Sequence, residues 1–234
     1  MNFEMIMDFF EENKNENNIS GMSKFGISTD KIYGIKMDSL RKLSKEIGND
    51  HELALQLWEH GYHESRILAT LIDEADRVDE DQLDEWVNDF DTWDICDQAC
   101  INLFSNIPLA ISKIPIWATS KKEFVKRTAF SLIAVIAVHD KKSDNSYFEN
   151  FFPLIKKASD DNRNFVKKAV NWALRSIGKK NKYLNEKAIE LAKEILELDY
   201  KSAQWIAKNA IKELESEEVQ NKLKALKKNK SNKF

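Results

Sequence analysis

The sequence predicts an all-α protein, arranged as a HEAT-like α-solenoid of antiparallel helix pairs with a concave basic surface. Its 234 residues include only 6 Gly and 3 Pro, too few for the frequent turns of an all-β fold. Apolar residues recur at helical spacing along the chain. Two such segments begin 41 residues apart, at Phe124 and Phe165, which matches the period of HEAT repeats. Periodicity alone is also compatible with an irregular helical bundle.

The predicted helices follow one another with short connections, beginning with an amphipathic segment at residues 3–10. Pro108 is suited to the first turn of a helix, where its missing N–H is not needed. Gly178 is suited to a C-terminal stop. The segment 16–36 is the least regular part of the sequence. The other predicted helices span residues 38–47, 53–61, 63–75, 83–87, 93–104, 123–138, 147–158, 164–177, 185–196 and 202–214.

We expect one domain over residues 1–234, because no Gly/Ser/Pro-rich linker interrupts the chain. Residues 1–100 carry 24 acidic and 9 basic groups, a balance of −15, whereas residues 101–234 carry 15 acidic and 27 basic groups, a balance of +12. This asymmetry indicates a basic surface in the C-terminal half that faces phosphates. Part of it comes from the Lys-rich stretch 222–234, which we interpret as a frayed, solvated tail.

The composition argues against several classes of protein. No apolar run approaches the ~20 residues of a membrane helix, and acidic residues stand where a secretory signal carries basic ones, so a cytoplasmic protein is expected. Cys96 and Cys100 are predicted to be reduced core thiols. The sequence contains no phosphate-binding loop or hydrolase motif, and its four His residues show no metal-ligand spacing. We expect a monomer without metal or cofactor.

One pair of residues carries a chemical signature. Trp93 and Asp97 lie one helical turn apart, so an indole and a carboxylate share a helix face. Such a pair suits a cationic, sugar-like reaction centre. Asp97 also lies within an apolar run, where a charge requires a partner or water, and the spacing alone favours an ion pair with a basic residue of the next helix. Asp91 or Thr92 is suited to cap this helix.

A second group surrounds another tryptophan. Trp172 lies beside Lys167, Lys168 and Arg175, which are suited to binding phosphates or are ordinary solvated cations. Arg127 lies one turn into a very apolar segment, and a buried guanidinium requires a carboxylate or phosphate partner. The other tryptophans have no polar signature and are predicted to lie in the core: Trp58, Trp86, Trp117 and Trp205.

The chain resembles the DNA alkylation repair family of HEAT-like DNA glycosylases. The resemblance covers about residues 20 to 215 and rests on four segments in the family's order. These are Gly34-Ile-Lys-Met-Asp-Ser-Leu-Arg-Lys-Leu, His63-Glu-Ser-Arg-Ile-Leu-Ala, Trp93-Asp-Ile-Cys-Asp and Phe165-Val-Lys-Lys-Ala-Val-Asn-Trp-Ala-Leu-Arg. The chain departs from the family pattern at Met37, in the region of a usual proline, and at Asn171, in place of a glycine.

The resemblance implies roles for the candidate residues. Asp97 corresponds to the family's catalytic carboxylate. Trp93 and Trp172 correspond to two aromatic residues that pack on the backbone of the damaged nucleotide. The implied DNA contacts are Arg127, Lys167, Lys168 and Arg175.

The implied activity is excision of cationic N3- or N7-alkylated purines from double-stranded DNA. A cationic base leaves readily, so a carboxylate that stabilises an oxocarbenium-like sugar and positions water is sufficient. Two alternatives remain open. One is a non-catalytic HEAT-like module that binds damaged or branched DNA. The other is a protein-binding solenoid whose acidic N-terminal half docks a basic partner.

Overall fold

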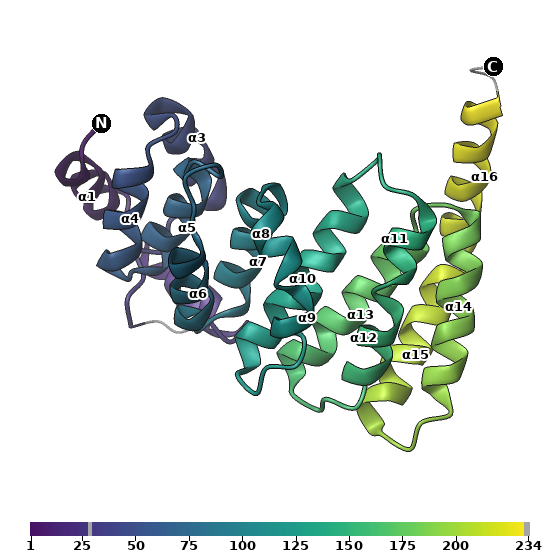
Figure 1. The fold of residues 1–234 in the computed structure, drawn as a ribbon. Coiled ribbons are helices and arrows are strands. Elements are labelled where there is room, and N and C mark those ends of the chain that lie inside the picture. Colours follow the sequence, from purple (N-terminus) through teal and green to yellow (C-terminus); the bar gives the residue numbers. More distant parts are fainter. Residues whose placement is uncertain (28–29, 232–234) are drawn as a thin grey trace. The chain divides into compact units, whose positions relative to one another are not determined.

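The computed structural model describes residues 1–27 and 30–231, with side chains described as far as residue 226. Every regular element within these residues is a helix (Figure 1). In chain order they are α1 (Phe3–Glu12), α2 (Glu16–Ser23), α3 (Met37–Ile47), α4 (His51–His60), α5 (His63–Ile72), α6 (Glu80–Asp89), α7 (Trp93–Asn102), the 3-10 helix η1 (Phe104–Asn106), α8 (Pro108–Ser112), α9 (Ile114–Trp117), α10 (Glu123–His139), α11 (Asn145–Glu149), α12 (Phe152–Ala158), α13 (Asn164–Gly178), α14 (Lys182–Leu196), α15 (Lys201–Leu214) and α16 (Glu217–Ser231).

The chain divides into two compact units, Met1–Ile111 and Ser112–Phe234. In the first unit α5 packs against α3 and α7, so these three helices form one layer. Helix α4 packs on α5, and α1 packs on α4. Sequential helix pairs stacked side by side are the arrangement of HEAT-like repeats. The predicted all-α, HEAT-like architecture is therefore confirmed, while a single domain over the whole chain stays a prediction.

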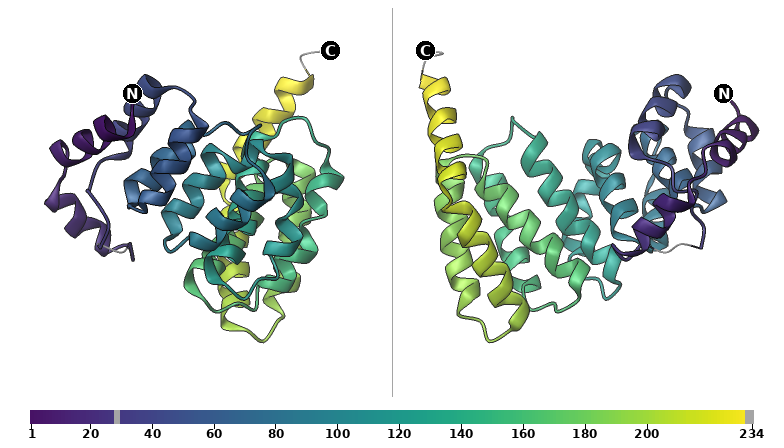
Figure 2. Two further views of the ribbon diagram at one scale, coloured as in Figure 1. Left: turned by 60° about the vertical axis from the view of Figure 1, so that its left-hand side comes forward. Right: turned by 180° about the vertical axis from the view of Figure 1, so that it is seen from behind.

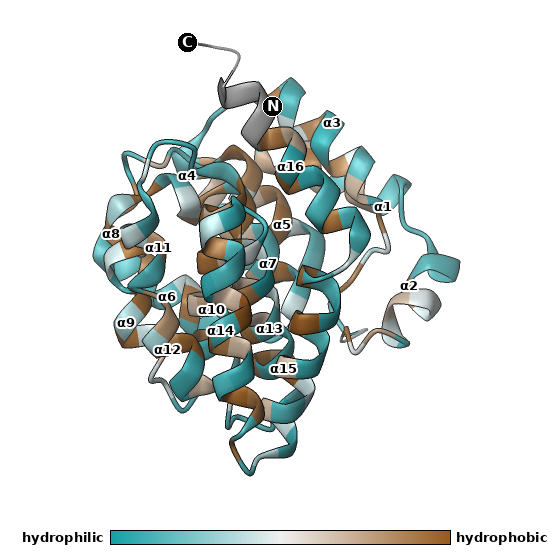
Figure 3. Ribbon diagram, turned by 90° about the vertical axis from the view of Figure 1, so that its right-hand side faces the viewer, coloured by the Kyte–Doolittle hydropathy of each residue, from teal (hydrophilic) through white to brown (hydrophobic). Residues whose placement is uncertain are grey.

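In the second unit α13 packs against α10, α14 and α15 (Figure 2). Helix α12 packs on α13 and α14, so α10, α13 and α15 form one layer and α12 and α14 the other. The helices carry apolar and polar residues at helical spacing (Figure 3). Helix α10, by contrast, is buried over most of its circumference, as its apolar sequence predicts. The functional candidates of this unit lie on α10 and α13.

Polar side chains fix where several helices begin. An Asn or Asp at the N-cap accepts a hydrogen bond of 2.9–3.0 Å from a backbone N–H of the first turn, which satisfies a donor that the helix itself leaves without a partner. The residues that cap in this way are Asn2, Asp50, Asp79, Asp144 and Asn181. Asn15 likewise caps α2, with a hydrogen bond of 3.1 Å. Thr92, one of the two predicted caps, occupies the N-cap position of α7, but its side chain accepts no capping hydrogen bond.

The core contains most of the aromatic residues predicted there. Trp58 and Trp86 stack with ring centroids 4.0 Å apart and are buried, and Trp117 is buried as well. Cys96 and Cys100 are buried thiols, as predicted. The prediction for Trp205 was wrong, because 39% of its surface is exposed. Smaller apolar residues supply the buried face of α15: Ala203, Ile206, Ala207, Ala210 and Leu214.

The segment 16–36, predicted to be the least regular part of the chain, contains one short helix, α2. Two further predictions need adjustment. Gly178 is the last residue of α13 rather than a residue beyond it, and it serves close packing, since a Cβ there would lie 2.8 Å from the methyl carbons of Leu214. The stretch 222–234 is helical as part of α16 up to Ser231, with Leu223 buried. Residues 232–234 lie outside the described residues.

Candidate functional site

The first candidate residue, Trp93, opens α7 in the N-terminal unit. Its side chain is partly exposed, and the indole N–H donates a hydrogen bond of 3.0 Å to the carbonyl oxygen of Phe25. The backbone of the segment before residue 27 therefore fixes the orientation of the indole ring. A ring held in this way presents one defined face to a ligand without losing rotamer entropy on binding.

The next residue, Asp94, forms a buried ion pair. Its Oδ2 lies 2.6 Å from Nε2 of His63, the first residue of α5, and both side chains are largely buried. Burial alone would lower the pKa of His63, but its contacts with Asp94 and Glu64 outweigh burial and raise the pKa to about 9. Burial likewise acts to raise the pKa of Asp94, and the pairing with His63 lowers it overall. The pair ties the first turn of α7 to that of α5.

A second buried carboxylate, Glu64, organises the segment before α3. It accepts hydrogen bonds from the backbone N–H groups of Tyr33, Gly34 and Ile35 at 2.9, 2.7 and 3.0 Å. Gly34 has a φ of +76°, and a Cβ there would lie 2.4 Å from the backbone oxygen of Asn15. The Gly34 and His63-Glu64 segments of the sequence resemblance therefore build structure within the same unit as Trp93.

The candidate catalytic residue, Asp97, lies one turn after Trp93 on α7 and is partly exposed. Its neighbours in sequence, Ile95 and Cys96, are buried, so α7 turns these residues inward and keeps the carboxylate near the surface. The spacing of four residues places the indole and the carboxylate on one helix face. Of the two acidic residues in the Trp-Asp-Ile-Cys-Asp segment, the first is held by His63 and the second shares the face of Trp93.

The C-terminal unit holds the second group of candidates on α13. Trp172 is partly exposed and Lys168 is exposed. The guanidinium of Arg175 pairs with Glu213 of α15, whose carboxylate also accepts a hydrogen bond of 2.7 Å from Lys179. Burial acts to raise the pKa of Glu213, but the two cations outweigh it and lower the pKa. Arg175 is therefore partly neutralised before any ligand arrives.

Two further residues connect α13 to its neighbours. Arg127 of α10 is 5% exposed, and its Nη1 donates a hydrogen bond of 2.6 Å to the carbonyl oxygen of Phe165. The amide of Asn171, buried in α13, donates a hydrogen bond of 3.0 Å to the carbonyl oxygen of Ile206 in α15. Both contacts fix the position of the helix that carries Trp172. Little of the Arg127 side chain is exposed, and its contact with DNA stays a prediction.

Lys167 also points toward α15. Its Nζ lies 4.9 Å from the centre of the Trp205 ring, a distance typical of a cation–π interaction. The predicted residues thus form two groups, one in each unit. The α7 group comprises Trp93 and Asp97. The α13 group comprises Lys167, Lys168, Trp172 and Arg175 of α13, together with Arg127 of α10.

The sequence analysis assigned no role to several residues that shape these groups, although most of them lie in the segments that carry the family resemblance. His63, Asp94 and Glu64 form buried polar contacts between helices, and their partners lie about 30 residues away in the chain. The one local signal was an acidic residue in the first turn of α5 and of α7. Acidic residues are common in the first turn of any helix, so this signal is weak. Asn171 and Trp205 gave no sequence signal of their roles.

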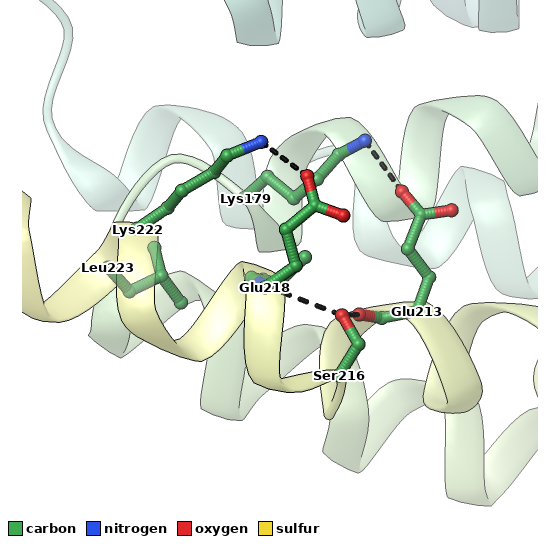
Figure 4. Close-up of a pocket in the computed structure, with 7 residues that line it drawn as sticks. Lys179, Glu213, Ser216, Glu218, Lys222 and Leu223 are labelled. Atoms are coloured by element: carbon green, nitrogen blue, oxygen red, sulfur yellow. Dashed lines mark hydrogen bonds and ion pairs between the residues drawn. The ribbon is translucent and has the colours of Figure 1, made fainter.

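A small pocket of about 160 Å³ lies near the C-terminal end of the second unit (Figure 4). Its charged lining residues form pairs, with Nζ of Lys179 2.7 Å from Glu213 and Nζ of Lys222 2.6 Å from Glu218. Val219 and Leu223 complete part of the wall. None of the predicted site residues lines it. Because these charges neutralise one another, the pocket provides little electrostatic attraction for a charged substrate.

No cluster of three or more His, Cys, Asp or Glu side chains in residues 1–27 and 30–226 is arranged to hold a metal ion. Within the part of the chain that the structure describes, no helix combines the length and apolar character that a bilayer crossing requires.

Comparison with one solved structure supports the fold. One structure aligns with a TM-score of 0.76 at 20% identity, covering 89% of this chain and 93% of the other. It represents a new family of proteins related to the HEAT-like repeat DNA glycosylases with affinity for branched DNA structures. A computationally designed armadillo repeat protein for modular peptide recognition aligns with a TM-score of 0.40 at 18% identity, covering 75% of this chain and 92% of the other.

Sequence comparison gives the family. Among curated proteins, none matches this chain. The family described as DNA alkylation repair enzyme matches residues 6–226, nearly the whole length. The match includes both the α7 group and the α13 group described above. The chain therefore belongs to the DNA alkylation repair enzyme family.

Proposed function

We propose that this protein is a DNA glycosylase that excises cationic N3- or N7-alkylated purines from double-stranded DNA. The observation that carries the proposal is the pair on α7, where Asp97 lies one turn from an indole fixed by the Phe25 carbonyl. Family membership and the HEAT-like fold support the same conclusion. A fold alone does not determine an activity, so the proposal depends on this pair.

In the proposed reaction the carboxylate of Asp97 acts on the sugar. Alkylation places a positive charge on the purine, which makes the base a good leaving group. As the glycosidic bond breaks, positive charge develops on the sugar, and a nearby carboxylate stabilises it and orients the attacking water. The face of Trp93 adds a cation–π contribution. Asp94 is unsuited to this role because its side chain is largely buried.

In the proposal the α13 group supplies affinity for DNA. Lys167, Lys168 and Arg175 bind phosphates, and Trp172 packs on the sugar–phosphate backbone, while Arg127 holds α13 in place and contributes its charge. Phosphate contacts give an affinity that falls as salt increases. Arg175 would exchange part of its contact with Glu213 for a phosphate. The protein is proposed to act as a monomer, with residues 1–234 forming one functional domain.

A second candidate function is binding of branched DNA without excision. One observation favours it: the structural relative with a TM-score of 0.76 is described as having affinity for branched DNA structures. This function uses the same α13 cations and requires no carboxylate. Measuring excision and branched-DNA affinity on one preparation distinguishes the two candidates.

The decisive experiment measures release of 7-methylguanine from methylated duplex DNA. The wild-type protein should release the base, and Asp97→Asn should not, while both bind the duplex equally. Asp91→Asn is a matched control, because Asp91 is an exposed acid shortly before α7. If the wild type releases no alkylated purine, the glycosylase proposal is wrong, and binding to a four-way junction then tests the second candidate.

A further inference from the structure

The exposed face of α15 carries a single stripe of basic residues around a tryptophan. Lys201, Trp205, Lys208 and Lys212 are all exposed and follow one another at intervals of four, three and four residues. At about 100° per residue these positions fall within a narrow arc of the helix. We call these four residues the α15 stripe.

The charges of the stripe differ from those of the neighbouring helix. Glu213 is the only acidic residue of α15, and it is occupied by Arg175 and Lys179. In the part of the chain that the structure describes, the three lysines of the stripe form no ion pair. On α14, by contrast, three glutamates each pair with a lysine: Glu186 with Lys182, Glu190 with Lys187 and Glu194 with Lys156. The positive charge of α15 is therefore not balanced locally.

Trp205 is unusual within this setting. A tryptophan that leaves 39% of its surface in water gives up part of the free energy that burial would provide. Lys167 lies 4.9 Å from the ring centre and holds the indole in position from the adjacent helix. The ring is thus presented at the surface between lysines on the same face.

We propose that the α15 stripe binds single-stranded DNA, with an unpaired base stacked on Trp205 and the lysines on the flanking phosphates. Surfaces that bind single strands combine a cationic track with aromatic side chains, because the faces of unpaired bases are open to stacking. A duplex keeps its base faces covered, and the carboxylates of an acidic peptide offer no aromatic face to stack on the indole. This role goes beyond excision of alkylated purines and does not require Asp97.

The test uses dye-labelled (dT)12 and fluorescence anisotropy with the full chain. Trp205→Leu should weaken binding by about fivefold or more, as expected for the loss of one stacked base, and Trp205→Phe should retain most of the affinity. Replacing all three stripe lysines with Gln should reduce the slope of log K against log salt by about 2. Because the three lysines are exposed, the lysine variant should unfold at the wild-type temperature.

Matched controls lie on α14, where Tyr183 is 45% exposed and Lys193 is exposed. Tyr183→Leu and Lys193→Gln should bind (dT)12 like the wild type. The proposal is overturned if polyglutamate of equal charge competes as well as unlabelled (dT)12. It is also overturned if Trp205→Leu binds normally, if the salt slope is unchanged in the lysine variant, or if the α14 variants lose as much affinity.

The result is separable from the proposed glycosylase activity. Asp97→Asn should bind (dT)12 with wild-type affinity. The wild type could release no 7-methylguanine while Trp205→Leu still weakens (dT)12 binding. In that case the single-strand proposal holds and the glycosylase proposal is wrong. A protein that releases the base but binds (dT)12 equally with and without Trp205 gives the reverse result.

Discussion

Nε2 of His63 lies 2.6 Å from Oδ2 of Asp94, joining the first turn of α5 to the first turn of α7. The residue before Asp94 is Trp93, whose indole contacts the Phe25 carbonyl. On its other side His63 faces Glu64, with Nδ1 3.8 Å from Oε2. The proposed catalytic helix is thus positioned by buried charges whose stability depends on pH.

The first prediction concerns that pH dependence. The pKa of His63 is raised to about 9 in the folded protein, whereas an unfolded histidine titrates near about 6.5. The protonated imidazole therefore stabilises the fold fully below about pH 6.5, and this contribution is lost as pH rises toward 9. Thermal unfolding should show the melting temperature decreasing over this window. Asp94→Asn should lower stability at about pH 6 by about 3 kcal/mol and flatten the decrease.

Asp91→Asn provides the control for that series, because the exposed carboxylate of Asp91 lies close by in the chain. Its melting curve should follow the wild type at every pH. An Asp94→Asn protein with unchanged stability in mild acid would contradict a stabilising role for the His63–Asp94 pair.

The second prediction concerns Glu64, which accepts three backbone hydrogen bonds. In Glu64→Gln the new amide group faces at least one of these N–H donors, and the substitution removes a buried charge that pairs with His63. We expect a loss of about 3 kcal/mol in the free energy of unfolding, measured by urea titration. Glu59→Gln, at an exposed position of α4, should change stability by less than about 0.5 kcal/mol. Equal effects at the two positions would contradict a stabilising role for the buried Glu64 carboxylate.

The third prediction separates backbone strain from steric overlap. Gly34 and Gly61 have nearly the same positive φ, +76° and +74°. A Cβ on Gly34 would lie 2.4 Å from a backbone oxygen, whereas at Gly61 the nearest atom is 3.6 Å away. Gly61→Ala should therefore cost about 1 kcal/mol for the left-handed backbone alone, and Gly34→Ala about 3 kcal/mol. Chemical denaturation of the two variants measures the difference, and equal losses would show that the loop around Gly34 adapts.

The fourth prediction is kinetic and tests the proposed function. Asp97→Asn should reduce the rate of 7-methylguanine release by about a hundredfold or more, as expected when a preorganised charge at the reacting centre is removed. Its melting temperature should remain close to that of the wild type, because the side chain is partly exposed. Single-turnover kinetics with saturating enzyme report the chemical step. A rate within a few fold of the wild type would remove Asp97 from the mechanism.

The helices themselves were largely predictable from the sequence. The segment predicted at residues 38–47 corresponds to α3 at Met37–Ile47, and the one at 185–196 corresponds to α14 at Lys182–Leu196. Such segments follow from the spacing of apolar residues, which is a local property. The stacked pair Trp58 and Trp86 was likewise predictable as core.

Contacts between distant segments were not predictable in this way. Glu64 lies among apolar residues of α5, and its partners at Tyr33 to Ile35 are set by the tertiary fold. A tryptophan such as Trp205 is usually a core residue. Its exposure here follows from the tertiary fold, which buries the face of α15 that carries smaller residues. The pairing of Asp94, the first acid of the Trp93 to Asp97 segment, could be seen only once His63 was in place.

The hydrogen bond from Asn171 to the Ile206 carbonyl has a mechanical consequence. It joins a side chain of α13 to the backbone of α15, so a shift of one helix along the other would break the bond or move both helices together. Trp172 and Trp205 lie on these two helices. Asn171→Gly would remove this link between the helices that carry the two indoles.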